Sequence, residues 1–176
     1  RLTYGELDRQ VAPIAAQLIA RHGLSPGDRV GIAMTNCAAF FPCLFGAWRA
    51  GLVAVPINAK LHPKEFAYIL DHSRSKACFV TPDLADDVAP LAADLEPLDA
   101  IISTDDREYE NLFLKEAQSS PIDLSPNDVA WLFYTSGTTG KPKGVQITHA
   151  NLINSTQARL EYYPEPVSSF LLLSSF

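Results

Sequence analysis

The sequence predicts an α/β protein with a mostly parallel sheet that carries helices on both faces. Short apolar runs typical of buried strands alternate with helical patterns through the first part of the chain. The predicted strands there cover residues 29–34, 52–55, 77–80 and 100–103. Such alternation is typical of parallel strands joined by crossover helices. The length of 176 residues is that of one domain with a sizeable core.

The helix before the first strand begins at a capping box. Thr3 precedes Glu6 by about one helical turn, and apolar residues then recur at helical spacing until a His-Gly pair. Pro13 lies inside this run and removes one intrahelical hydrogen bond. We therefore expect a kink there, or a helix that restarts near Ile14.

Three further helices are expected between the strands. They cover residues 38–50, a segment that Pro63 opens in its first turn, and residues 83–95. In the first of them, aromatic residues recur at helical spacing, which predicts that they pack in the core. These residues are Phe40, Phe41, Phe45 and Trp48.

The last third of the chain predicts a linker followed by two strands and a helix. Residues 118–128 are rich in Ser, Pro and Asp and predict a surface linker into a strand over 129–134. A short strand over 145–148 follows, then a helix from His149 towards Tyr162 with Thr148 as its N-cap. We interpret His149 as a structural residue at the start of this helix.

The composition excludes several classes of protein. The chain is 47% hydrophobic and 19% charged, as in ordinary globular proteins, and its net charge of -6 would repel a polyanion, so no nucleic-acid partner is expected. No apolar run reaches the about 20 residues of a transmembrane helix. Cys37, Cys43 and Cys78 are odd in number and lack metal-ligand spacing. They predict free thiols in a reducing compartment, and so a cytoplasmic protein.

The stretch "YTSGTTGKPKGV", residues 134–145, predicts a phosphate-binding loop. Its glycines leave room for backbone N–H groups to converge on an anion, its hydroxyls add donors and its lysines add positive charge. The candidate binding residues are Thr135, Ser136, Gly137, Thr138, Thr139, Gly140, Lys141, Lys143 and Gly144. Two commoner nucleotide patterns do not fit. The P-loop would require Gly-Lys-Ser/Thr, and G-x-G-x-x-G lacks its first glycine.

The full string resembles the phosphate-binding signature of the adenylate-forming superfamily, which includes acyl-CoA synthetases, adenylation domains of peptide synthetases and firefly luciferase. The segments "GDRVGIAMTN", "FGAWRAGLVAVPIN" and "THANL" are similar to the same family. The resemblance implies that residues 1–176 are the N-terminal part of the large AMP-binding domain, and both ends look truncated. It also places the main catalytic lysine beyond Phe176, so no catalytic residue is expected here and this segment alone is expected to be inactive.

The resemblance implies an activity. In this family a carboxylate attacks the α-phosphate of ATP, pyrophosphate leaves, and a thiol then takes the acyl group. Residues 135–140 would enclose the β- and γ-phosphates, Lys141 and Lys143 would neutralise them, and Thr135 would contact Mg²⁺. The implied partners are ATP and a small carboxylic acid.

The thiol acceptor is left open between two possibilities. The segment "INAKLHPKEFAYILDHS" resembles acyl-CoA synthetases and favours coenzyme A, whereas "FLLLSSF" is closer to adenylation domains that load the phosphopantetheine of a carrier protein. We favour coenzyme A. A noncatalytic nucleotide-binding module and a structural segment without ligand affinity are the alternatives of another class.

Overall fold

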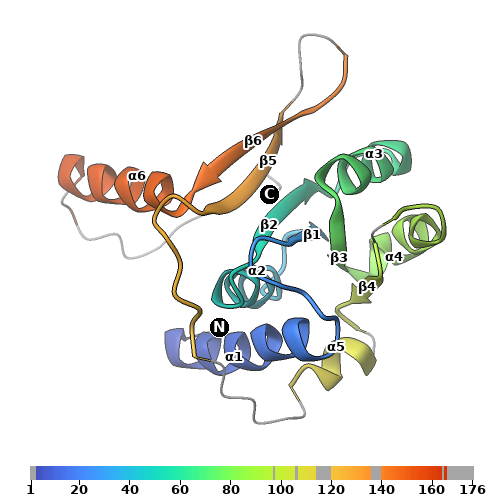
Figure 1. The fold of residues 1–176 in the computed structure, drawn as a ribbon, viewed down its shortest axis with the longest axis horizontal. Helices are drawn as coiled ribbons and strands as arrows, with labels where there is room; N and C mark the ends of the chain where they lie inside the picture. Colours follow the sequence, from blue (N-terminus) through green and yellow to red (C-terminus); the bar gives the residue numbers. More distant parts are fainter. Residues whose placement is uncertain are drawn as a thin grey trace.

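The computed structural model describes residues 3–96, 98–105, 107–113, 120–135, 140–163 and 165. Its centre is a six-stranded sheet in the order β4-β3-β1-β2-β5-β6 (Figure 1). Neighbouring strands run parallel except for β6, which is antiparallel to β5. The strands are β1 Arg29–Met34, β2 Val53–Asn58, β3 Ser75–Val80, β4 Ala100–Ser103, β5 Val129–Thr135 and β6 Lys143–Thr148. The predicted fold class is thereby confirmed.

Helices cover both faces of the sheet, as expected. The hydrophobic cluster on one face joins α1 and α2 to the segment around α5, and the cluster on the other face joins α3 and α4. The helices are α1 Tyr4–Ala20, α2 Phe40–Arg49, α3 Pro63–Ser73, α4 Pro82–Val88, the 3-10 helix Ala89–Ala93, α5 Arg107–Asn111 and α6 His149–Tyr162. The helix predicted over 83–95 thus changes to a 3-10 turn near Pro90, whose ring nitrogen cannot donate a helical hydrogen bond.

Side-chain caps fix where three of these helices begin. At α1, Thr3 N donates to Glu6 Oε2 at 2.7 Å, while Glu6 N donates to Thr3 Oγ1 at 3.3 Å. The same reciprocal pair forms at α6 between Thr148 and Asn151. At α3, His62 precedes the proline, and its Nδ1 accepts from Lys64 N at 3.2 Å. The helix α1 continues through Pro13 and does not restart near Ile14.

The core lies between the sheet and the two helix layers. Ile14 and Leu18 of α1 and Phe40 of α2 are buried on one face, and Phe66 and Leu70 of α3 on the other.

The core prediction was wrong for two of the aromatic residues of α2. Phe41 and Phe45 are 42% and 39% exposed, because they lie on the side of α2 that faces away from α1 and the sheet. Helical spacing alone predicted that all four aromatic residues lie on one buried face, whereas they lie on two faces of α2. Trp48 is partly buried against the core, and its Nε1 donates to Ala130 O at 2.8 Å.

The three cysteines are free thiols, as predicted. Cys43 and Cys78 are buried, whereas Cys37 is half-buried. Burial raises the pKa of the Cys78 thiol to about 12 and also raises the pKa of Cys43. Both buried thiols therefore stay protonated at neutral pH and are poor nucleophiles.

The strands β5 and β6 and the helix α6 form an arm that extends from the rest of the molecule (Figure 1). The strand β5 joins the sheet where Trp131 pairs with Ala54 of β2. No described residue of α6 is buried. Large apolar side chains on the arm are exposed, including Phe133, Val145, Ile153 and Leu160.

The contact between α1 and α2 gives a stability prediction. A Cβ on Gly46 would lie 2.5 Å from Ile14 Cγ2, so Gly46→Ala should lower the free energy of unfolding by about 1–3 kcal/mol through overpacking. Gly5→Ala is the matched control, because nothing lies within 4 Å of its Cβ position. Urea unfolding followed by tryptophan fluorescence measures both. An equal loss of stability in both variants would contradict this account of the helix contact.

Candidate phosphate-binding loop

The predicted loop lies at the end of the hairpin formed by β5 and β6. The hydrogen-bonded register places Thr135 opposite Lys143 and Tyr134 opposite Gly144. The strand β6 begins at Lys143, so Lys143 and Gly144 belong to the strand and not to a loop that ends before Val145. Because antiparallel partners lie about 5 Å apart, the hydroxyl residue that enters the loop and a lysine that leaves it are neighbours.

The nine predicted binding residues divide into two groups. Thr135, Gly140, Lys141, Lys143 and Gly144 are in the described part of the chain. The remaining four, Ser136, Gly137, Thr138 and Thr139, lie outside the described residues. The structure therefore shows both flanks of the loop, and the flanks are close together.

Two glycines at this hairpin are explained by different structural constraints. Gly140 has a φ of +90°, a conformation that side chains other than glycine rarely adopt, although no atom lies within 4 Å of its Cβ position. Gly144 is restricted by space, because a Cβ would lie 3.0 Å from Leu132 Cδ1 and 3.2 Å from Tyr134 Cζ. One glycine permits the turn and the other permits close packing of the hairpin.

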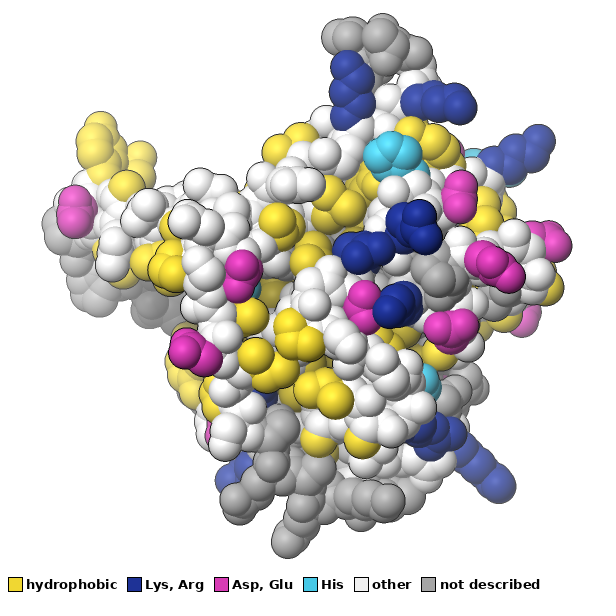
Figure 2. All heavy atoms as spheres, viewed as in Figure 1, with side chains coloured by type: hydrophobic (Ala, Val, Ile, Leu, Met, Phe, Trp, Pro, Cys, Tyr) yellow, Lys and Arg dark blue, Asp and Glu magenta, His cyan; other side chains and the backbone are white. Residues whose placement is uncertain are grey.

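Positive charge gathers at the end of the hairpin, where Figure 2 shows basic side chains. Lys141 and Lys143 are both exposed, and among the described residues neither has an ion-pair partner. Lys141 Nζ lies 5.6 Å from the centroid of the Tyr68 ring, within the range of a cation–π contact. Both ammonium groups are thus available to an anion even though the chain carries a net charge of -6.

The helix α3 supplies residues at this site that the sequence analysis missed. His72 Nδ1 lies 2.7 Å from the Tyr134 hydroxyl oxygen, and the Tyr68 hydroxyl donates to Pro142 O at 3.2 Å. Burial, followed by the nearby Tyr68, raises the pKa of Tyr134 to about 12, so its hydroxyl keeps its proton at neutral pH. Sequence spacing carried no signal for these contacts, because 62 and 74 positions separate the partners.

His149 lies where it was predicted, at the first position of α6. Its backbone N donates to Asp128 O at 3.1 Å, and its ring centroid is 6.1 Å from that of Trp48. These contacts attach α6 to the residue before β5 and to α2, and the structural role of His149 stays an interpretation.

No group of three metal-ligating side chains is present within the described part of the chain. The contact of Thr135 with Mg²⁺ stays a prediction. None of the described helices is long and apolar enough to cross a membrane.

The comparisons with known proteins agree with the predicted family and the fold. The family model described as "AMP-binding enzyme" matches residues 1–174, and the chain therefore belongs to this family. A feruloyl-CoA synthase of an Amycolatopsis species is 40% identical over 154 residues, and a long-chain-fatty-acid–CoA ligase of Mycobacterium tuberculosis is 33% identical over 156 residues. Each alignment covers 86% of this chain, but only 29% and 30% of those relatives.

Solved structures show the same arrangement. The ATP-bound crystal structure of MatB from Rhodopseudomonas palustris superposes with a TM-score of 0.81 at 27% identity, over 93% of this chain and 33% of that one. The chain thus spans about a third or less of the length of these proteins.

The backbone of Gly140 gives a prediction about nucleotide binding. Gly140→Ala places a side chain at a φ of +90°, and the resulting strain of about 1–3 kcal/mol should weaken ATP binding about tenfold in the whole protein. Gly27→Ala is the control, because Gly27 has a φ of +86° and equally open surroundings, but lies in the turn before β1. Isothermal calorimetry gives the ATP dissociation constant of each. Equal weakening by both substitutions would argue against a role for this loop in binding ATP.

Proposed function

We propose that the protein containing this chain is an acid–CoA ligase that activates a carboxylic acid with ATP. A carboxylate oxygen of the acid attacks the α-phosphorus of ATP, and pyrophosphate leaves. The sulfur of coenzyme A then attacks the acyl carbon, and AMP leaves with the former carboxylate oxygen. The observation that carries the proposal is the hairpin that places Lys141, Lys143 and Thr135 around the superfamily's loop sequence.

The described residues would act on the leaving pyrophosphate. Attack by one anion on another is slow unless charge is neutralised, and positioned cations supply that neutralisation at phosphoryl centres. The backbone of Lys143 is held in the strand opposite Thr135, so the point from which its side chain extends is fixed. Lys141 lies on the turn side of Pro142 and supplies a second charge. Hydroxyls and backbone N–H groups of residues 135–140 would donate to the β- and γ-phosphate oxygens.

Magnesium would fit this arrangement as a partner of the triphosphate. Mg²⁺ is commonly bound in such sites by one or two protein oxygens together with phosphates and waters. Thr135 Oγ1, at the exposed end of β5, would provide one such oxygen. When bound, the ion would neutralise part of the phosphate charge.

The relatives favour coenzyme A as the acceptor. The names of the feruloyl-CoA synthase and the long-chain-fatty-acid–CoA ligase both include coenzyme A. They differ in the acid, one aromatic and one aliphatic, so they support a carboxylic acid as the substrate class without selecting between these two kinds. Loading of a carrier-protein phosphopantetheine is the second acceptor to test.

We further propose that residues 1–176 are the N-terminal part of a larger AMP-binding domain, with residues 118–128 as the linker into β5. The described part of this linker has no helix or strand, and Ile122 N donates to Arg49 O at 3.2 Å. The exposed apolar side chains of the arm support a larger domain, because a globular protein normally covers such a surface. In a longer chain that includes downstream sequence, α6 should be better protected from hydrogen exchange than in residues 1–176 alone.

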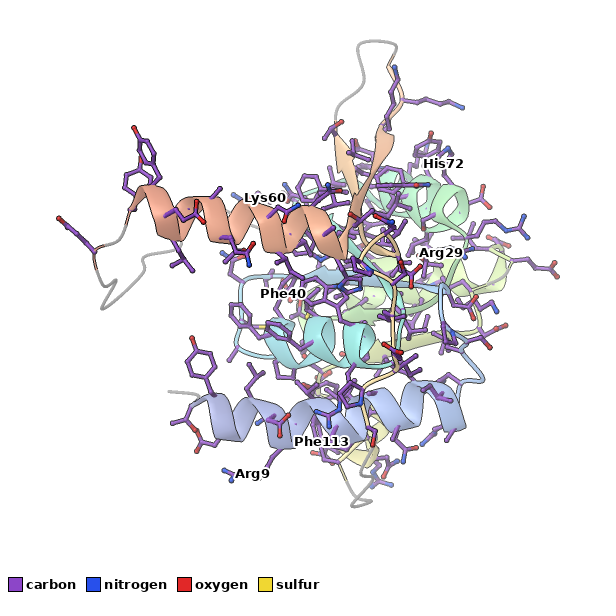
Figure 3. All side chains as sticks on the ribbon, turned by 60° about the vertical axis from the view of Figure 1, so that its left-hand side comes forward. Arg9, Arg29, Phe40, Lys60, His72 and Phe113 are labelled. Carbon is purple, nitrogen blue, oxygen red and sulfur yellow. The ribbon has the colours of Figure 1, made fainter. Side chains whose placement is uncertain are left out.

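Substitutions in the loop test the proposal. In the whole protein, Lys143→Ala and Thr138→Ala should each lower the rate of acid-dependent ATP–pyrophosphate exchange about 100-fold, the size expected when one group that stabilises developing charge is removed. Arg9→Ala is the charge-matched control. Arg9 is an exposed cation on α1, and it lies far from the hairpin (Figure 3).

The outcomes separate the alternatives. Near wild-type exchange in both loop variants would refute the catalytic assignment of this loop. ATP binding without exchange in the unmodified protein would identify a noncatalytic nucleotide-binding module, and no heat on titration with ATP and Mg²⁺ would identify a structural segment. Thioester formation with free coenzyme A, measured beside a phosphopantetheinylated carrier protein, decides the acceptor.

A further inference from the structure

One helix contacts both flanks of the phosphate loop. On the flank that enters the loop, His72 of α3 is bonded to Tyr134 of β5 at 2.7 Å. On the flank that leaves it, Tyr68 of the same helix is bonded to Pro142 O at 3.2 Å. Tyr68 and His72 are one helical turn apart, so they lie on the same face of α3. Figure 3 shows His72 at the side of α3 that is near the hairpin.

The side chains of α3 also contact each other. The rings of Tyr68 and His72 are stacked, with centroids 5.4 Å apart and an interplanar angle of 27°. The His72 ring meets the Tyr134 ring edge to face, at 5.8 Å and 85°. Tyr68, His72 and Tyr134 therefore form a continuous row of rings, which we call the ring row. It limits the rotamers of the two side chains that hold the loop.

The ring row packs against a buried hydrophobic cluster. Next to Tyr68 in α3, Phe66, Ile69 and Leu70 are each 1% exposed. Tyr68 and Tyr134 both pack against this buried cluster. A helix anchored in this way cannot shift without opening the core, so the contacts it makes to the loop flanks have a fixed position.

We propose that Tyr68 and His72 are positioning residues that set the orientation of the two flanks of the phosphate loop relative to the sheet. The inference rests on the proposed function, because it concerns how the same loop holds the triphosphate. The Tyr68 hydroxyl fixes the carbonyl of Pro142, which lies between the two lysines, and the Tyr68 ring attracts Lys141. His72 fixes Tyr134, which directly precedes Thr135.

The physical benefit is preorganisation. Loop flanks that are already held lose less conformational freedom when a ligand binds between them. Donors and cations that are already in place also stabilise developing charge without reorganising during the reaction. The β5–β6 register alone fixes the separation of the flanks, but it does not fix how the hairpin is oriented relative to the sheet, because the hairpin extends away from it (Figure 1). The ring row supplies that second constraint.

A simple packing role for Tyr68 and His72 predicts a different result. Residues that only stabilise the fold affect both half-reactions through loss of folded protein. Residues that position the phosphate loop affect adenylate formation, in which pyrophosphate leaves, and have little effect on thioester formation from a preformed acyl-adenylate, which has no β- or γ-phosphate. The two half-reactions are therefore the appropriate readouts.

The first test uses Tyr68→Phe in the whole protein, which removes the donor to Pro142 O and keeps the ring. We expect KM for ATP in pyrophosphate exchange to rise about threefold to tenfold, the effect of one lost hydrogen bond. The rate of coenzyme A transfer from added acyl-adenylate should stay unchanged. Tyr109→Phe is the matched control, because the Tyr109 hydroxyl interacts with Cys43 of α2, on the other face of the sheet from α3.

The second test concerns His72. His72→Ala should raise KM for ATP in the same way, whereas His72→Asn should restore it, since an amide can replace Nδ1 as a partner of the Tyr134 hydroxyl. In a Tyr134→Phe background, His72→Ala should add little, because the hydroxyl through which His72 acts is gone.

Three results would overturn the inference. One is wild-type KM for ATP in both Tyr68→Phe and His72→Ala. Another is an equal loss in the two half-reactions together with a lower Tm, which would indicate a structural role. The third is an equal rise in KM for ATP in Tyr109→Phe. Absence of pyrophosphate exchange in the unmodified protein would instead refute the proposed function, so the two failures are distinguishable.

Discussion

The antiparallel pairing of β6 with β5 is the constraint on which the site depends. It closes the chain on itself after Thr135 and returns it at Lys143, so that residues from both flanks of the loop lie side by side. The close approach of Gly144 to Leu132 and Tyr134 shows how tightly the two strands pack. A parallel return would need a long crossover and would separate the hydroxyl from the lysine. The chemistry proposed for the loop therefore follows from one strand reversal at the edge of a parallel sheet.

The arm that carries this reversal is attached to the sheet at a few defined places. Trp48 of α2 donates to Ala130 O, and Trp131 of β5 pairs with Ala54 of β2. Beyond Trp131 the hairpin leaves the sheet, and side chains of α3 contact it instead. Exposed lysines on a backbone that contacts a helix anchored in the core have an advantage for the proposed phosphate chemistry, because the lysines stay accessible to a ligand while the backbone beneath them is held. The net negative charge of the chain does not oppose this, since no acidic side chain among the described residues is paired with either lysine.

Much of the fold could be predicted because its signals are local. The capping pairs at Thr3 and Thr148 fixed two helix starts, and Pro63 marked the third. The buried strands were readable because a central parallel strand is apolar on both faces, as Arg29–Met34 illustrates. The prediction failed where burial depends on what packs opposite. Phe41 and Phe45 have the same spacing and chemistry as their buried neighbour Phe40, and only the position of α1 and the sheet leaves them exposed.

The sequence by itself determined the fold class, the location of the candidate phosphate loop and the residue types that would bind an anion. Those properties depend on local pattern and on the identity of side chains, and both can be read directly from the sequence. Only the tertiary structure decided that Lys143 lies in a strand opposite Thr135, and that Tyr68 and His72 contact the flanks of the loop. The His72–Tyr134 and Tyr68–Pro142 hydrogen bonds join residues that are 62 and 74 positions apart. They leave no periodic pattern in a sequence, because they depend on how a helix packs across a sheet.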